Sequence, residues 1–288
     1  MPASQRVPPP LSEPKESGGS LPQHARWTLE GRLIEASNVV LRMADVSSLA
    51  EVPDDPSELP DDAARAVFKP VAGERPLADF PRGTLAHREV AASLVCAALG
   101  WDHVPETRWF EDELGEGSLQ RWVGPLVPTE QAHVALLDEQ EFISQQGSVH
   151  PIAAFEGEDG PLVLVHADTP ALRRIAVFDT VTNNADRKGS HLIETPEALF
   201  AIDNGLTFHT DDKLRTVLWG FAGDPLEEPI EAALRRLVAA RGELTQELAS
   251  LLAPAEIEAL HARTDALLEA GTFPDPPEER YGLPWPPL

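Results

Sequence analysis

The chain has 288 residues, 42% of them apolar and 25% charged, and its 48 acidic and 23 basic side chains give a formal net charge of −25. These proportions are typical of a globular protein, and the negative charge disfavours nucleic-acid binding and electrostatic docking on anionic membranes. The single cysteine, Cys96, excludes an internal disulfide, and without CxxC or HExxH spacings a structural zinc site is not expected.

The two ends of the chain have compositions unlike the middle. Residues 1–24 are rich in Pro, Ser and Gly, which predicts a disordered tail. This tail lacks the apolar core of a secretory signal, and the chain has no apolar run long enough for a transmembrane helix. We therefore expect a cytoplasmic protein without stable membrane anchoring. Residues 272–288 form a Pro-rich irregular segment, which we expect Tyr281 and Trp285 to attach to the body.

The first elements after the tail are predicted to be strands. Residues 27–46 contain two β-like runs interrupted at 36–38, which predicts a hairpin, and a further β-like run over 65–70 ends at a proline. A helix is predicted over 84–99, with the glycine at position 100 as its C-terminal cap. Two more strands are expected within 104–110 and 117–123. We interpret 25–123 as a small β-rich lobe.

The second part of the chain is predicted to be mainly helical. Residues 124–165 are acidic and loop-like and are interpreted as a candidate insertion. Thr169 and Pro170 are typical of a helix start, and two short strands are expected within 191–205. Helical spacing of apolar residues then recurs towards residue 268. The expected fold is α+β, with a β-rich lobe over 25–123, a helical lobe over 124–271, and a ligand site between them.

Lys69 is the first candidate for chemistry. It lies in the strand-like run 65–70, and alternation alone would let it face solvent. Glu89, however, lies on the apolar stripe of the helix that follows, where a carboxylate needs a partner because burying it alone is costly. A lysine on the adjacent strand is the natural partner. Protein kinases hold the lysine that contacts the ATP phosphates by such a pair.

Asp186 and Asp203 are the next candidates. Each follows an apolar segment, and they lie at the two ends of the predicted hairpin within 191–205, so both carboxylates can reach one site. One carboxylate could bind a divalent cation while the other acts as a base for a hydroxyl nucleophile. The alternative is that both are turn residues, since Asn183-Asn184 and Asn204-Gly205 also favour turns.

These residues lie in segments that resemble a known family, the phosphatidylinositol 3-/4-kinase-related superfamily. The closest resemblance is to type II phosphatidylinositol 4-kinases and the short bacterial proteins related to them. The matching segments, in chain order, are "VFKP" (67–70), "EVAASLV" (89–95), "VPET" (104–107), "GSLQRWV" (117–123), "NNADRKGSHLI" (183–193) and "AIDNGLTFH" (201–209). The resemblance implies a two-lobed protein-kinase-like fold and an ATP- and Mg²⁺-dependent (or Mn²⁺-dependent) phosphotransferase.

The resemblance also implies a role for each matched residue. Lys69 would contact the ATP phosphates, with Glu89 orienting it. Asp186 would be the catalytic aspartate with Arg187 beside it in the loop, and Asp203 would bind the metal. The hinge that bonds the adenine through its backbone would consist of Gln120, Arg121, Trp122 and Val123.

The chain departs from the family pattern near the metal and the phosphates. Eukaryotic members have an Asn metal ligand at the position of His191, so Asn184, Ser190 or His191 itself could be the second ligand here. The phosphate loop is poor in glycine, so Ser37 and Asn38 would present backbone N–H groups to phosphate.

The expected acceptor and the competing functions follow from the same departures. The chain lacks the acylated cysteine cluster of the type II lipid kinases and a basic membrane face, so we expect the acceptor hydroxyl to lie on a protein or small molecule. Three alternatives stay open. They are a pseudokinase that binds nucleotide or partners without transfer, a true phosphatidylinositol kinase, and an enzyme that transfers AMP.

Overall fold

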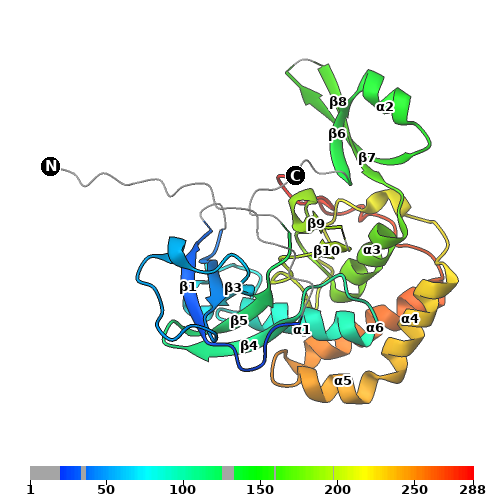
Figure 1. Ribbon diagram of the computed structural model, residues 1–288. Helices are drawn as coiled ribbons and strands as arrows, with labels where there is room; N and C mark the ends of the chain where they lie inside the picture. Colours follow the sequence, from blue (N-terminus) through cyan, green and yellow to red (C-terminus); the bar gives the residue numbers. More distant parts are fainter. Residues whose placement is uncertain (1–19, 34–36, 125–132, 159, 197) are drawn as a thin grey trace.

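The computed structural model describes residues 20–33, 37–124, 133–158, 160–196 and 198–288. The fold is a mixed α+β fold, as the sequence predicts, with a sheet in the first part of the chain and mostly helices in the second (Figure 1). In the described part of the chain, no helix is both long and apolar enough to cross a membrane.

A five-stranded antiparallel sheet forms the first part, with strand order β1-β2-β3-β5-β4. Its strands are β1 (Trp27–Arg32), β2 (Leu41–Asp45), β3 (Arg65–Pro70), β4 (Thr107–Asp112) and β5 (Gly115–Arg121). Ala66 and Phe68 of β3 pack into an apolar cluster with Met43 and Leu119. Because side chains alternate along a strand, Lys69 points to the opposite face of the sheet.

Helix α1 (Leu85–Ala98) connects the sheet to the second part of the molecule. It contacts β4 and β5, and it also contacts the helices that follow later in the chain. Its predicted bounds are confirmed, since Thr84 is the N-terminal cap residue and Gly100 has the positive φ of 74° typical of a helix end. Ala91, Val95 and Cys96 of α1 belong to the main apolar core. Helix α1, which carries Glu89, therefore packs against both the sheet and the helical part of the molecule.

The segment expected to be loop-like is folded. It contains β6 (Val134–Asp138), α2 (Glu139–Gln145), β7 (Val149–Gly157) and β8 (Gly160–Ala167), paired in the order β6-β8-β7. Figure 1 shows this subdomain projecting away from the rest of the molecule. The helix begins with a capping box, in which the Asp138 carboxylate accepts a bond from the Glu141 N–H and the Glu141 carboxylate accepts one from the Asp138 N–H. We call residues 133–167 the insertion.

The remaining elements build the helical part. They are α3 (Pro170–Thr182), β9 (Leu192–Glu194), β10 (Leu199–Ala201), α4 (Glu228–Ala239), α5 (Arg241–Leu248) and α6 (Pro254–Ala270), with 3-10 turns η1 (Pro56–Glu58), η2 (Val71–Gly73), η3 (Gly189–His191) and η4 (Trp219–Phe221). As predicted, α3 starts at Thr169, whose hydroxyl accepts a hydrogen bond from the Leu172 N–H at 3.2 Å. The pair β9–β10 is the predicted hairpin.

The C-terminal segment 272–288 lies against the body. Tyr281 and Trp285 are 59% and 68% exposed, so neither is buried in the body, although the Trp285 ring lies 6.1 Å from the ring of Phe155 in the insertion. Phe273 is buried in the core instead. Backbone hydrogen bonds attach the last residues, including one from the Gly189 N–H to the Pro287 carbonyl at 2.8 Å. A Pro-rich segment offers few N–H donors, so its carbonyls make these contacts.

Candidate active site

The structure brings together three charged side chains from distant parts of the chain. Lys69 of β3 forms an ion pair with Glu89 of α1, and its Nζ also lies 3.0 Å from Oδ1 of Asp203, two residues after β10. Burial alone would lower the pKa of Lys69, but the negative charges of Asp203 and Glu89 outweigh it and raise that pKa above its ordinary value. Lys69 is therefore a fixed cation that remains partly open to solvent.

Glu89 holds the segment after β10 as well as the lysine. Its side chain is buried, and its second carboxylate oxygen accepts a hydrogen bond from the Asn204 backbone N–H at 3.1 Å. A buried carboxylate is stable only when its oxygens are bonded, and here both are. The sequence argument that Glu89 needs a partner is thus confirmed, with Asn204 as an additional one.

Asp203 is held in a conformation that few residues adopt. Its φ is +58°, in the left-handed region that Asp and Asn tolerate better than other side chains. Its side chain is 55% exposed, and Oδ2 lies 3.5 Å from Nε2 of His191. The positive charge of Lys69 outweighs burial and lowers the pKa of Asp203, so the group is a carboxylate at neutral pH. Burial lowers the pKa of His191 to about 4, so its imidazole is neutral.

The loop that contains Asp186 is built on a buried ion pair. Arg187 and Asp179 of α3 are both fully buried, with Arg187 Nη2 3.0 Å from Asp179 Oδ1. The same guanidinium donates to Oδ1 of Asn204 at 2.6 Å and to the Ile202 carbonyl at 2.6 Å. Arg187 therefore joins the loop to the segment that carries Asp203. Because no part of it is accessible, its predicted place among the catalytic residues is corrected to that of a positioning residue.

Asp186 itself is only partly buried. Its backbone N–H donates to Oδ1 of Asn184 at 2.9 Å, and Lys188 Nζ lies 3.2 Å from its carboxylate. Burial raises the pKa of Asp186, against the opposing effect of Lys188, and the negative charge of Asp203 adds to the rise. The structure therefore places Asp186 within electrostatic reach of Asp203, as the hairpin argument predicts, with its carboxylate partly open to solvent.

The three other predicted metal ligands, Asn184, Ser190 and His191, lie in different environments. Asn184 is fully buried, and its amide bonds the Asp186 N–H and Asp179, so the prediction that it binds a metal is corrected to a structural role. Ser190 is exposed, and within the described residues it makes no hydrogen bond to Asp203. His191 contacts Asp203 directly. Of the three, only His191 adjoins the carboxylate.

The donor set at Asp203 fits a magnesium ion that is shared with a substrate. Within the described ranges, no three His, Cys, Asp or Glu side chains are grouped so as to hold a metal ion by themselves. Mg²⁺ is usually held by one or two carboxylates, with water and substrate phosphates completing its shell. Asp203 supplies an exposed, ionised carboxylate, and Asp186 adds a second, partly exposed carboxyl group nearby.

The predicted hinge residues form the end of β5 and the chain just after it, close to the β9–β10 hairpin. The buried Gln120 side chain donates to the Thr107 hydroxyl at 2.9 Å. The backbone N–H of Trp122 donates to the Arg65 carbonyl at 3.1 Å. Val123 is buried and the Arg121 guanidinium lies 5.2 Å from the centre of the Phe200 ring. The sheet and the hairpin therefore meet at 121–123.

The predicted phosphate loop is only partly described. Residues 34–36, which precede Ser37, lie outside the described residues. Ser37 is exposed, and the Asn38 carboxamide accepts a hydrogen bond from the Arg75 N–H at 2.8 Å. The Val39 N–H donates to the Gly73 carbonyl at 3.1 Å. The β1–β2 connection is thus attached to the β3–α1 connection.

Two residues of the site were missed at the level of the sequence. Asp179 lies in an apolar run of α3, which was a signal of the same kind as Glu89, because a carboxylate buried in a helix needs a cation. Arg215 forms backbone hydrogen bonds with the loop on both sides of Asp186, and no local pattern in the sequence indicates it. Its contact arises from a long-range pairing of two irregular segments.

Three solved structures match most of the chain at low sequence identity. Hydra Fam20 with sugar covers 85% of this chain and 85% of its own, at 14% identity and a TM-score of 0.44. The Golgi casein kinase structure covers 85% of this chain and 72% of its own, at 13% identity and a TM-score of 0.45. The structure of the Helicobacter pylori proinflammatory kinase CtkA covers 87% of this chain and 93% of its own, at 10% identity and a TM-score of 0.43. All three TM-scores lie below 0.5, so the correspondence is loose.

A much closer match is found at the level of sequence. No family model matches the chain. Protein Rv2133c of Mycobacterium tuberculosis is 38% identical to it over 268 residues, which are 90% of this chain and 91% of the relative. The chain belongs to the same family as this mycobacterial protein.

Proposed function

We propose that the protein is an ATP- and Mg²⁺-dependent phosphotransferase with a protein-kinase-like fold, related to the phosphatidylinositol 3-/4-kinase superfamily. The observation that supports it best is the contact of Lys69 with both Glu89 and Asp203. A lysine on the third strand, a glutamate on the following helix and an aspartate after a later hairpin are the arrangement in which kinases hold ATP phosphates and metal. The acceptor hydroxyl belongs to a protein or a small molecule.

Each side chain then has a defined task. Lys69 binds phosphate oxygens as a fixed cation, and Glu89 keeps it in place while holding Asn204. Asp203 holds the divalent cation, which neutralises charge on the phosphates. The acceptor oxygen bonds to the γ-phosphorus as the bond from that phosphorus to the bridging oxygen of ADP breaks. Asp186 receives the hydroxyl proton, and burial raises the pKa of its carboxyl group above the ordinary value, which favours this uptake.

The backbone after β5 is the proposed adenine site. Residues 121–123 end β5 and leave the sheet beside the β9–β10 hairpin, and the backbone N–H groups of Arg121 and Trp122 donate to the carbonyls of Glu106 and Arg65 at 2.8 and 3.1 Å. Gln120 is occupied by Thr107, so its side chain is not available to the base. The proposal therefore rests on the backbone of Val123, the last of the predicted hinge residues.

A comparison of two substitutions tests the proposed function. Asp203→Ala should weaken binding of ATP in the presence of Mg²⁺ and remove the metal dependence of that binding, measured by calorimetry. Asp186→Asn should leave ATP binding intact and reduce phosphoryl transfer by about 10²–10⁴-fold, the usual contribution of a general base. If Asp203→Ala changes neither ATP affinity nor its metal dependence, Asp203 is only a turn residue and the proposal is wrong.

A pseudokinase is the second candidate, and the contact between His191 and Asp203 favours it. An imidazole stands where eukaryotic relatives carry an oxygen donor, and Mg²⁺ prefers oxygen. His191→Asn should raise Mg²⁺ affinity or transfer if His191 occupies a weakened ligand position. Wild-type protein that binds Mg-ATP but transfers nothing to any acceptor, including itself and water, would identify the pseudokinase. Intact-mass measurement of the product distinguishes transfer of phosphate from transfer of AMP.

A further inference from the structure

Arg215 is fixed against the loop that carries Asp186. Its backbone N–H donates to the Asn184 carbonyl at 2.9 Å, and its carbonyl accepts from the Arg187 N–H at 3.0 Å. These two bonds lie on either side of Asp186 in the chain. The Val217 N–H donates in turn to the Arg187 carbonyl at 3.1 Å, which extends the contact. The position of Arg215 relative to Asp186 is therefore set by the backbone.

The Arg215 guanidinium is bonded through its Nε, and its charge is not neutralised by an ion pair with any described residue. Its Nε donates to the Tyr281 carbonyl at 3.3 Å, and the side chain is partly exposed. Among the residues that the structure describes, no carboxylate lies within 4.0 Å of its guanidinium nitrogens. The neighbouring cations Lys213 and Arg280 are paired, with Asp79 at 3.1 Å and with Asp212 at 2.6 Å. Arg215 thus differs from the basic groups next to it.

The charge of Arg215 acts on the candidate active site. It lowers the pKa of Asp186, against the dominant effect of burial, and it also contributes to the lowered pKa of Asp79. An unneutralised arginine is notable here because the chain has twenty-five more acidic than basic groups. Lys188 is already engaged with Asp186, which reduces the repulsion that an approaching anion would meet.

We propose that Arg215 is a specificity-determining residue, and that it binds a carboxylate or phosphate carried by the acceptor close to its reactive hydroxyl. This inference rests on the proposed phosphotransferase function and adds the chemical class of the acceptor. Arginine suits the task because its planar guanidinium can donate two parallel hydrogen bonds to a carboxylate or phosphate. Its Nε is bonded to Tyr281, which leaves the two terminal nitrogens for the acceptor.

The test compares two pairs of acceptors, each with a charged and a neutral member. One pair is a serine peptide flanked by Glu and the same peptide flanked by Gln, and the other is glycerol 3-phosphate and glycerol. Their affinities are measured on the full chain with Mg²⁺ and a non-hydrolysable ATP analogue, and transfer from ATP is measured in parallel. The peptide pair reports an acidic protein acceptor, and the glycerol pair reports an anionic small molecule.

The expected result is an anion preference that depends on Arg215. Wild-type protein should bind the charged member of at least one pair about tenfold or more tightly, the usual strength of a charge-assisted hydrogen bond. Arg215→Gln should bring this ratio close to one, and Arg215→Lys should restore part of it. Arg280→Gln removes a neighbouring charge that already has a partner, so it serves as the matched control and should keep the preference.

Two results would overturn the inference, and both differ from failure of the proposed function. Wild-type protein without an anion preference in either pair contradicts it. So does an equal loss for charged and neutral acceptors in Arg215→Gln, because Arg215 would then act only through Asp186. Failure of the proposed function appears separately, as absence of transfer to every acceptor, and the affinity ratios still decide the role of Arg215 in that case.

Discussion

At the scale of single residues, the site separates side chains that build it from side chains that could act on a ligand. Arg187, Asp179 and Asn184 are buried and bonded to one another or to the backbone. Lys69 and Asp203 are also ion-paired, but they remain open to solvent. This difference in exposure leads to opposite expectations for substitution, since buried pairs affect stability and exposed ones affect binding.

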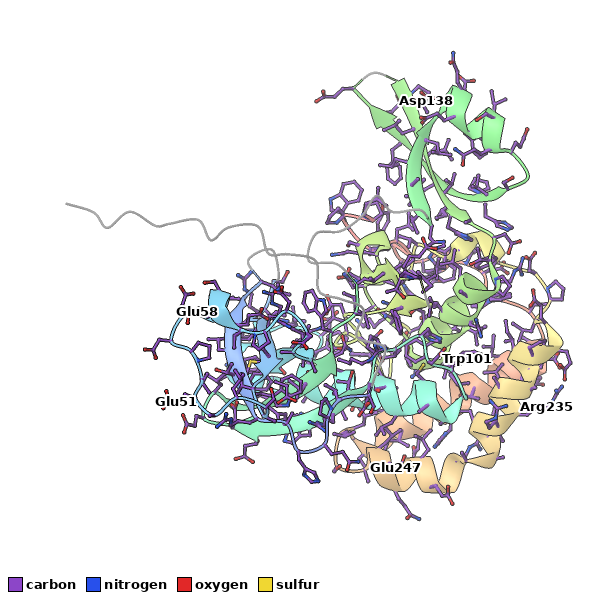
Figure 2. All side chains as sticks on the ribbon, in the orientation of Figure 1. Glu51, Glu58, Trp101, Asp138, Arg235 and Glu247 are labelled. Carbon is purple, nitrogen blue, oxygen red and sulfur yellow. The ribbon has the colours of Figure 1, made fainter. Side chains whose placement is uncertain are left out.

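The buried pair gives the first stability prediction. Arg187→Met should lower the free energy of unfolding by about 3–5 kcal/mol, because it leaves the Asp179 carboxylate buried without its cation. Arg235→Gln is the control, since Arg235 is 60% exposed on α4, where Figure 2 shows it at the edge of the molecule, and its ion pair with Glu231 should contribute less than about 1 kcal/mol. Urea unfolding measures both. Equal effects would mean that the buried pair does not hold the loop.

At the scale of elements, the insertion is attached to the helical part through a histidine. His166 of β8 is fully buried, its Nε2 accepts a hydrogen bond from the Gly220 N–H at 3.0 Å, and its Nδ1 lies 2.8 Å from the Ala167 carbonyl. Gly220 belongs to η4, and a side chain there would collide with His150 and His166. The junction therefore depends on a neutral imidazole packed against a bare backbone.

This junction predicts a pH dependence. Burial lowers the pKa of His166 from 6.5 to about 4. Below pH 6.5 the unfolded chain takes up a proton that the folded protein does not, so stability falls as the pH drops from 6.5 to 4. The free energy of unfolding should fall by about 2 kcal/mol between pH 7.5 and pH 5, since each pH unit between the two pKa values contributes about 1.4 kcal/mol. The glutamine variant His166→Gln cannot titrate there.

Urea unfolding of wild type and His166→Gln at the two pH values isolates this effect, because the other buried histidines titrate equally in both proteins. The free-energy difference between the two proteins should be larger at pH 7.5 than at pH 5. A difference that does not change with pH would show that His166 is not the titrating group at the junction.

The elements also show which parts of the fold could be predicted from sequence. The strands over 27–46 and 65–70 and the helices beginning near 84 and 169 carry their own signals, in alternation, caps and proline positions. The insertion was missed because its three strands are only partly buried, so their apolar alternation is weak, although the capping box of Asp138 and Glu141 was readable. Its sheet is stabilised by packing that local sequence does not reveal.

The candidate site also contains residues whose roles could be predicted from the sequence and residues whose roles could not. Glu89 could be assigned a partner because a carboxylate on an apolar stripe demands one, and that argument would have found Asp179 too. The roles of Arg187 and Asn184 could not be read, since polar residues in a turn look the same whether they face a ligand or the core. Only the fold decides which of them the backbone turns inward.

At the scale of the whole molecule, several acidic groups lie at the periphery, and several arginines are buried where chain segments meet. Glu51, Glu58 and Glu247 are drawn at the outer edges in Figure 2. Arg88 of α1, by contrast, is buried between its ion pair with Glu256 of α6 and the Thr207 carbonyl. The negative charge thus keeps copies of the protein apart, while buried arginines hold its parts together.

The C-terminal segment is one of these meeting points, and it gives the last prediction. The carbonyls of Gly282 and Pro287 accept hydrogen bonds from the N–H groups of Thr216 and Gly189 at 3.2 and 2.8 Å, and the Trp219 indole donates to Gly282 at 2.8 Å. Removing residues 280–288 should therefore lower the free energy of unfolding by about 2–4 kcal/mol, since each bond contributes about 1 kcal/mol and some packing is lost with them. The amide of Gly189 should also exchange faster with deuterium.

The substitution Trp285→Ala is the control for this truncation, because an exposed side chain contributes little and its effect should stay within about 0.5 kcal/mol. The two variants separate the backbone contacts of the segment from its most prominent side chain. If Trp285→Ala destabilises the protein as much as the truncation does, the segment is held by its aromatic residue after all. If the truncation leaves both stability and the exchange of the Gly189 amide unchanged, the segment does not support the loop that carries Asp186, because Asp186 lies only three residues before Gly189.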